Sequence, residues 1–227
     1  MAQLPLDLGH LPALGREDFL LAGSNQAAVQ WLETWPAWPA PSLALYGASG
    51  AGKTHLAHVF AARVRDAGGR LGFIDPTALT VDAVPVQLGD ATDLVLDGAR
   101  AAPEEALLHL HNLVAERGGH LLVVATEPPA QWNIRLADLR SRLLAAPAVG
   151  IEPPDDALLA AVLLKLFRDR QLTVTEDVIG YLIARIERSF AGARDIVGRL
   201  DKAALAQQRA VTVPLARAVL AESGRDT

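Results

Sequence analysis

The sequence predicts an α/β fold in which a parallel five-stranded sheet is followed by a small all-helical domain. In the first two thirds of the chain, short continuous apolar runs alternate with helical patterns, which is typical of a parallel sheet covered on both faces. After Pro153 and Pro154 only helical periodicity is found. We therefore expect a tail at residues 1–18, an α/β core at 19–153 and a helical domain at 154–227.

Each element is predicted from its own pattern and boundary residues. Ser24 has the character of a helix start, and the proline-rich stretch 36–41 ends that helix. The expected strands are 42–46, 71–75, 93–97, 120–126 and 149–151. The expected later helices are 53–67, a helix from Pro103 at its first position to 117, then 155–171, 175–189, 191–208 and a short one after Pro214.

The composition excludes several classes of protein. With 227 residues, 51% hydrophobic and 21% charged, the chain is expected to bury a core, and it has no apolar run of the roughly 18 residues that a membrane span needs. The absence of cysteine excludes disulfides and thiolate metal sites and favours a reducing compartment. Because the start of the chain has no export pattern, we expect a cytoplasmic protein. A net charge of -5 argues against sequence-independent DNA binding and favours a protein partner.

A glycine-rich run follows the first predicted strand and opens the next predicted helix. It consists of Gly47, Ala48, Ser49, Gly50, Ala51, Gly52, Lys53 and Thr54. The run matches the phosphate-loop pattern G-x-x-x-x-G-K-[ST] in the strand-turn-helix context that this motif requires. We expect its backbone N–H groups to converge on the β-phosphate and Lys53 to reach the β- and γ-phosphate oxygens, and the Thr54 hydroxyl can ligate Mg²⁺. The sequence therefore predicts a site for ADP or ATP with Mg²⁺.

Asp97 ends the third predicted strand and is the expected second Mg²⁺ residue, facing the phosphate loop from a neighbouring strand. Gly98 follows it, at the position where ring-forming ATPases usually carry a second acid that positions the attacking water. We therefore expect weak or no hydrolysis by this chain alone. Glu104 and Glu105, just after Pro103, are expected to stabilise a helix start.

The phosphate loop carries a resemblance to a known family. The stretch Gly52-Lys53-Thr54-His55-Leu56 resembles the bacterial replication initiator DnaA, whose AAA+ core commonly reads GKTHL. The resemblance covers residues 19–222 and implies an AAA+ core with a helical lid. It implies that His55 belongs to the nucleotide site, and that the stretch from Phe19 through Ser24 and Asn25 packs over the adenine.

The same resemblance assigns three further residues. Arg194, in Ala193-Arg194-Asp195, is similar to the sensor 2 arginine that folds back from the lid onto the phosphates. The stretch 138–143 resembles the box whose arginine acts in trans on a neighbouring subunit's nucleotide; Arg142 is the expected finger and Arg140 the competing candidate. Thr126, ending the fourth predicted strand, stands where such cores place a polar sensor for the γ-phosphate.

Two features of DnaA are not expected here. The residues after Arg209 are too few for its DNA-reading helix-turn-helix domain. The interval 71–99, where the initiator carries an insertion that contacts single-stranded DNA, contains no Lys or Arg. Because such binding needs a basic groove, we expect no strong direct DNA binding.

The tail resembles the short peptide by which bacterial proteins dock on the sliding clamp of DNA polymerase. It contains a glutamine followed by spaced leucines, namely Gln3, Leu4, Leu6 and Leu8. Glutamine can satisfy polar groups at a pocket rim while the leucines enter an apolar pocket. A clamp peptide on a DnaA-like core without the DNA-reading domain is the arrangement of the Hda family, regulators that inactivate DnaA.

The resemblance to Hda implies a nucleotide-bound protein that docks on the clamp and stimulates hydrolysis of DnaA-bound ATP, which prevents over-initiation of replication. Three alternatives stay open: a DnaA-paralogue adaptor that delivers a replication factor without triggering hydrolysis, a free-standing P-loop ATPase, and a small-molecule kinase. Gly98 and the lid with Arg194 count against the kinase, in which the tail peptide has no role. The sequence leaves a homodimer open.

Overall fold

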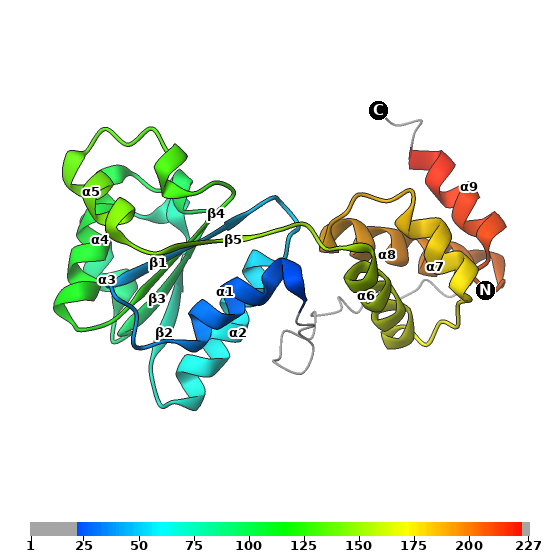
Figure 1. Cartoon of the computed structure of the whole chain (residues 1–227), viewed down its shortest axis with the longest axis horizontal. Helices are drawn as coiled ribbons and strands as arrows, with labels where there is room; N and C mark the ends of the chain where they lie inside the picture. The colour runs from blue at the N-terminus through cyan, green and yellow to red at the C-terminus, as the bar shows by residue number, and fades with distance from the viewer. Residues whose placement is uncertain (1–21, 224–227) are drawn as a thin grey trace, which may run out of the picture.

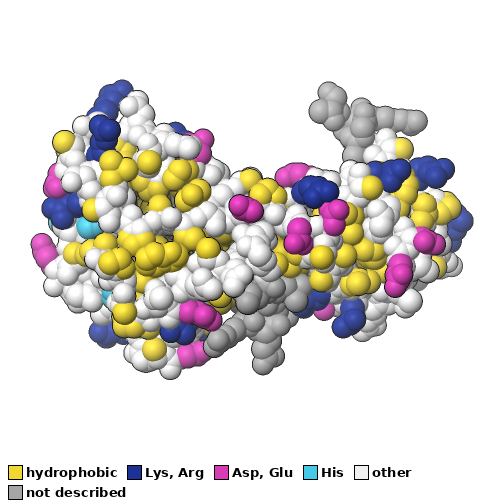
Figure 2. All heavy atoms as spheres, in the orientation of Figure 1, with side chains coloured by type: hydrophobic (Ala, Val, Ile, Leu, Met, Phe, Trp, Pro, Cys, Tyr) yellow, Lys and Arg dark blue, Asp and Glu magenta, His cyan; other side chains and the backbone are white. Residues whose placement is uncertain are grey.

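The computed structural model describes residues 22–223. Figure 1 shows two lobes, an α/β core and a group of helices joined to it after the last strand. Acidic and basic side chains are interspersed over both lobes on the face drawn in Figure 2. Within the described residues, no helix is both long and apolar enough to cross a membrane.

The core is built on a parallel sheet of five strands. They are β1 (Ser42–Gly47), β2 (Leu71–Ile74), β3 (Asp93–Asp97), β4 (Leu121–Ala125) and β5 (Ala148–Ile151). Their order across the sheet is β2-β3-β4-β1-β5. Leu45 in β1 pairs with Val124 of β4 on one side and with Val149 of β5 on the other. Because all strands run the same way, the phosphate loop after β1 and Asp97 at the end of β3 lie at the same edge of the sheet.

Helices cover both faces of the sheet, which explains the continuous apolar strands. The core helices are α1 (Gly23–Glu33), α2 (Lys53–Asp66), α3 (Val84–Leu88), α4 (Glu104–Glu116) and α5 (Ala137–Ala145), with 3₁₀ turns at Pro76–Ala78, Ala99–Ala101 and Pro129–Gln131. Val95 packs with α1 and α2 on one face, whereas its neighbours Leu94 and Leu96 pack with α3, α4 and α5 on the other. The α/β class with a five-stranded parallel sheet is confirmed.

The second lobe is helical and has its own apolar core. Its helices are α6 (Asp156–Asp169), α7 (Glu176–Ile183), α8 (Phe190–Gln207) and α9 (Val213–Ser223). Leu163, Phe167 and Leu200 are among its fully buried side chains. The Asp155 side chain caps α6 by accepting the N–H of Leu158 at 2.7 Å.

The structure corrects several boundaries expected from sequence. α7 ends at Ile183, six residues before the expected end; just after it, the N–H of Arg185 bonds to the Leu182 carbonyl three residues earlier, as in a tighter turn. Pro103 is the N-cap of α4 rather than its first residue. Residues 138–140 lie in the first turn of α5, a helix that is not among the elements expected from sequence.

Candidate functional site

The phosphate loop joins β1 to α2 and makes a close contact with the helical lobe. Gly52 has φ +100, a left-handed conformation that L side chains rarely adopt, and a Cβ there would lie 3.0 Å from the Phe190 ring. The backbone N–H of Phe190 donates to the Gly50 carbonyl at 2.9 Å. The start of α8 therefore rests directly on the loop, which brings the two lobes together at this edge of the sheet.

Lys53 folds back into the loop. Its Nζ donates to the carbonyl oxygens of Gly47 and Ala48, both at 2.8 Å. Burial lowers the pKa of Lys53, and the carboxylate of Asp97 opposes that shift. In this position the ammonium is partly desolvated and held by neutral carbonyls, so a phosphate entering the loop would offer it a stronger, charge-assisted partner.

The structure brings Thr54 and Asp97 together. The Thr54 hydroxyl donates to Asp97 Oδ2 at 2.6 Å. The expectation that Asp97 lies on a strand next to the loop's strand is wrong, because β4 separates β3 from β1. A hydroxyl and a carboxylate are the hard oxygen ligands that Mg²⁺ prefers, so the pair fits the metal. Within residues 22–223 no cluster of three or more His, Asp or Glu forms a metal site, so the remaining ligands would be phosphate oxygens and water.

Gly98 adopts a conformation that suits glycine. Its φ is +80 and ψ is 31, in the left-handed region. A glutamate at this position would carry the strain that a left-handed residue with a Cβ incurs. The backbone conformation at residue 98 therefore favours glycine over the second acid that ring-forming ATPases usually carry after the metal-binding aspartate.

Thr126 follows β4 directly and is exposed. β4 lies between β1, which leads into the phosphate loop, and β3, which ends at Asp97. Because the strands are parallel, Thr126 lies at the same edge of the sheet as the loop and Asp97. Its hydroxyl makes no hydrogen bond with another described residue.

Ser24 and Asn25 open α1 beside the end of β5. The Ser24 carbonyl accepts the N–H of Glu152 at 3.0 Å. Asn25 is 2% exposed, and its Oδ1 accepts the N–H of Ala22 at 3.0 Å. α1 is thereby attached to the strand next to β1, which places its start at the loop edge of the sheet. His55 is half-buried on the first turn of α2.

Arg194 lies one helical turn after Phe190 in α8, so the helix that carries it begins on the phosphate loop. The arginine is exposed, and within the described residues it forms no ion pair. Residues four apart share a helix face, so Arg194 projects from the same side of α8 as Phe190.

Arg142 and Arg140 lie away from the phosphate loop and the residues around it. Both are on α5, at the end of the core farthest from the helical lobe (Figure 1). The Arg142 guanidinium makes two hydrogen bonds to the Asp138 carboxylate, Nε to Oδ1 at 3.1 Å and Nη2 to Oδ2 at 3.2 Å. Arg140 is exposed and has no ion pair within residues 22–223.

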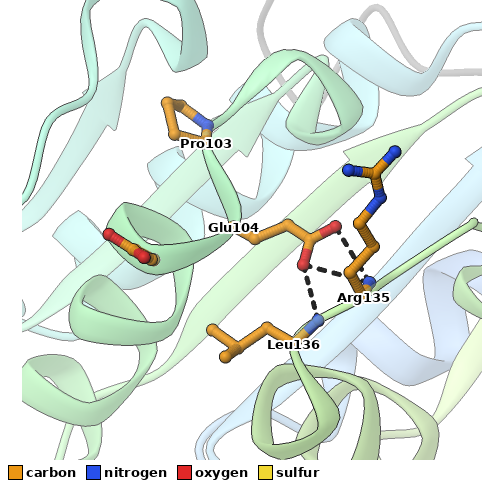
Figure 3. Close-up of a pocket in the computed structure, with 5 residues that line it drawn as sticks. Pro103, Glu104, Arg135 and Leu136 are labelled. Atoms are coloured by element: carbon orange, nitrogen blue, oxygen red, sulfur yellow. Dashed lines mark hydrogen bonds between the residues drawn. The ribbon is translucent and has the colours of Figure 1, made fainter.

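Glu104 has a role that its position in the sequence does not reveal. It lies in the first turn of α4, as expected, but its carboxylate reaches across to the segment before α5 (Figure 3). It accepts the N–H of Leu136 at 2.7 Å, and the N–H of Arg135 lies 3.1 Å from each carboxylate oxygen. The N–H groups of Arg135 and then Leu136 hold the pKa of Glu104 below its ordinary value. Pro103, Glu105 and these residues line a hollow of about 410 Å³.

The residues of the predicted clamp peptide, Gln3, Leu4, Leu6 and Leu8, and Phe19 of the stretch before the core, lie outside the described residues.

The family model described as "Hda, lid domain" matches residues 156–220, which span α6 to α9 within the described chain. The fold is similar to domain III of the replication initiation protein DnaA from Thermotoga maritima, with a TM-score of 0.79 at 18% identity over 93% of this chain and 97% of that one. The helical lobe therefore matches the Hda lid domain, and the chain has the fold of DnaA domain III. We call α6 to α9 the lid from here on.

Other solved structures share this fold. AMPPCP-bound DnaA from Aquifex aeolicus matches with a TM-score of 0.69 and 17% identity over 82% of this chain and 64% of that one. The Thermotoga maritima RuvB Holliday junction branch migration motor matches with a TM-score of 0.66 and 15% identity, over 79% of this chain and 61% of that one. At these identities the structural matches establish the fold alone, and the match to the Hda lid concerns residues 156–220.

Proposed function

We propose that this protein is an Hda-type regulator that binds ADP or ATP, docks on the DNA polymerase sliding clamp and stimulates hydrolysis of the ATP bound to DnaA. The Hda-type lid and the DnaA-like fold support a DnaA-related replication regulator. The proposal adds three statements to these matches: clamp docking, stimulation of hydrolysis and a cytoplasmic location.

Nucleotide binding is assigned to the loop edge of the sheet. Lys53 would contact the phosphates, Thr54 and Asp97 would hold Mg²⁺, and Ser24, Asn25 and His55 would border the rest of the nucleotide. Bound Mg²⁺ would neutralise phosphate charge. Arg194 would approach the phosphates from the lid, and Thr126 from the end of β4. Since Gly98 replaces the second acid in a left-handed position, the proposal gives this chain weak or no ATPase activity of its own.

The observation that carries the proposal is the separation between this nucleotide site and Arg142. The phosphate loop contacts the lid, whereas α5 lies at the opposite end of the core with Arg140 exposed and Arg142 part-exposed (Figure 1). This separation supports a role for Arg142 on a neighbouring molecule rather than at this chain's own nucleotide site. A guanidinium beside a γ-phosphate stabilises charge that develops in the transition state.

The ion pair with Asp138 does not oppose this role strongly. Exposed pairs four residues apart on a helix contribute about 0.3–0.5 kcal/mol. A finger changes the rate of hydrolysis by about 10³–10⁵ in other systems, which corresponds to about 4–7 kcal/mol. The gain in the transition state therefore exceeds the cost of releasing Asp138 by several kcal/mol.

The proposal is tested by measuring hydrolysis of DnaA-bound ATP while clamp, DNA and this protein are added in turn. We expect the rate to rise above the DnaA baseline only when all components are present, because the tail holds the protein on the loaded clamp. Clamp binding with an unchanged hydrolysis rate would favour the adaptor instead. Brisk ATP turnover by the isolated chain, at several per second, would favour a free-standing ATPase.

A further inference from the structure

We propose that Glu104 is a positioning residue for α5, the helix that carries Arg142, and that it fixes the orientation from which the finger acts. The expected effect on DnaA hydrolysis rests on the proposed function, whereas the placement of α5 by Glu104 rests on contacts within this chain.

The start of α5 has no cap of its own. Its N-cap residue is Leu136, whose side chain cannot accept a hydrogen bond, and no side-chain cap is formed within the helix. The first N–H groups of a helix lack intrahelical partners. In a capping box a glutamate inside the helix bonds the N-cap N–H. Here Glu104 performs this task from α4, 32 residues earlier in the chain.

The carboxylate holds two successive peptide units from one side (Figure 3). It accepts the N–H of Leu136 at 2.7 Å while both oxygens lie 3.1 Å from the N–H of Arg135. An ionised acceptor makes these bonds shorter and stronger than neutral ones. Both backbone units before α5 are therefore fixed relative to α4.

A second anchor lies farther along α5. Leu139 and Leu143 are each 1% exposed and pack into the core cluster beneath α4. Apolar packing fixes the depth of the helix in the core, and the hydrophobic effect behind it is non-directional. The Glu104 bonds supply the directional restraint that packing lacks, and they act six to seven residues before Arg142.

The segment that bears Glu104 starts at the nucleotide site. Asp97 ends β3, and the short connection through the 3₁₀ turn Ala99–Ala101 leads to α4. Arg100 in this connection pairs with Glu127, which follows Thr126. Arg100 in the connection and Glu104 at the start of α4 therefore bond to the chain between β4 and α5 at two points.

Glu105 provides a matched control. It lies beside Glu104 in the first turn of α4, so both carboxylates interact with the same positive helix end. Unlike Glu104, it makes no hydrogen bond or ion pair with residues 22–223. A charge effect at the start of α4 would be similar for Glu104→Gln and Glu105→Gln, whereas a positioning effect belongs to Glu104 alone.

The structural part is tested by amide hydrogen exchange of the full-length protein, without partners. A neutral amide offers one acceptor oxygen in place of two charged ones. In Glu104→Gln we expect the Arg135 and Leu136 amides to exchange about 10-fold faster than in wild type, with the rate unchanged in Glu105→Gln. Equal exchange in Glu104→Gln and wild type would overturn the assignment.

The functional part is tested in the DnaA hydrolysis assay with clamp and DNA. A shift of about 1 Å in a reacting group can cost a factor of about 10²; we therefore expect Glu104→Gln to lower the maximal stimulated rate by at least about 5-fold. The amount of protein needed for half-maximal effect, the nucleotide affinity and the midpoint of thermal unfolding should stay near wild type. Loss of stability alone would instead lower the midpoint.

Normal maximal stimulation by Glu104→Gln, or an equal loss in Glu105→Gln, would overturn the positioning role. If wild-type protein gives no stimulation, the proposed function has failed, and the exchange experiment decides the role of Glu104 at α5 on its own.

Discussion

The Thr54 hydroxyl donates a 2.6 Å hydrogen bond to the Asp97 carboxylate, although the strands that lead to these two residues are separated by β4. The bond spans the width of one strand because α2 begins at the sheet edge and Thr54 is in its first turn. It places a hydroxyl and a carboxylate oxygen together at the mouth of the phosphate loop.

Asp97→Asn should make nucleotide binding insensitive to Mg²⁺. A neutral amide oxygen is a weaker ligand for a hard divalent cation than a carboxylate. Titration of a fluorescent ADP analogue with Mg²⁺ or with EDTA measures the effect, and wild type should bind more tightly with the metal. Asp75→Asn is a suitable control, because Asp75 also follows a strand but bonds to Thr77. An unchanged response to Mg²⁺ in Asp97→Asn would remove Asp97 from the metal site.

Lys53→Ala should weaken nucleotide binding and reduce stabilisation by nucleotide. A ligand at 100 times its Kd raises the free energy of unfolding by about 2.7 kcal/mol when it binds only the folded state. Wild type should therefore show a clear rise in Tm with ADP, and Lys53→Ala little or none at the same concentration. Equal rises in the two proteins would show that the nucleotide binds elsewhere.

His111 gives a prediction on pH dependence. It is 4% exposed on α4; burial first, and then Arg142, lower its pKa, while Asp138 opposes the shift. Between the lowered folded pKa and the unfolded value near 6.5, the unfolded chain binds more protons, so stability is present above about pH 6.5 and is lost as pH falls. Its contribution to the slope is at most about 1.4 kcal/mol per pH unit.

Denaturant unfolding of wild type and His111→Gln at several values between pH 5 and 7.5 checks this prediction. The variant should lose less stability than wild type on acidification, whatever its stability at pH 7.5. Parallel pH profiles for the two proteins would contradict it.

The tail prediction concerns the clamp. Replacement of Gln3, Leu6 and Leu8 by alanine should abolish retention on immobilised clamp, because two leucines buried in a pocket contribute about 1.5–3 kcal/mol each. Circular dichroism and the nucleotide-induced rise in Tm should match wild type, since the substitutions lie outside the predicted core. Undiminished retention would rule out docking through this peptide.

The sequence predicted those parts of the fold that depend on local patterns. The bounds of β3 were predicted as observed, and the phosphate loop was found from its own residues because glycine spacing and a following helix are local signals. α5 was missed although Leu136, Leu139 and Leu143 have helical spacing, because its cap comes from Glu104, a long-range contact that no local pattern shows.

The candidate site was likewise predictable where it depends on local sequence patterns. The sequence predicted that Thr54 and Asp97 lie at one site, and the structure brings them together. The sequence did not predict that β4 lies between their strands, since strand order is a property of the whole sheet. The contact between Phe190 and the phosphate loop joins residues far apart in the chain and had no sequence signal. The roles assigned to Arg142, Arg194 and Thr126 stay predictions.

The central claim is that this protein completes the ATP site of DnaA in trans, and the rate of DnaA-bound ATP hydrolysis with Arg142→Ala tests it most directly. In the presence of clamp and DNA, we expect Arg142→Ala to return the rate to the DnaA baseline while its nucleotide and clamp binding match wild type, and Arg140→Ala to stimulate normally. Normal stimulation by Arg142→Ala with loss in Arg140→Ala would assign the finger to Arg140. Normal stimulation by both variants would contradict the trans mechanism.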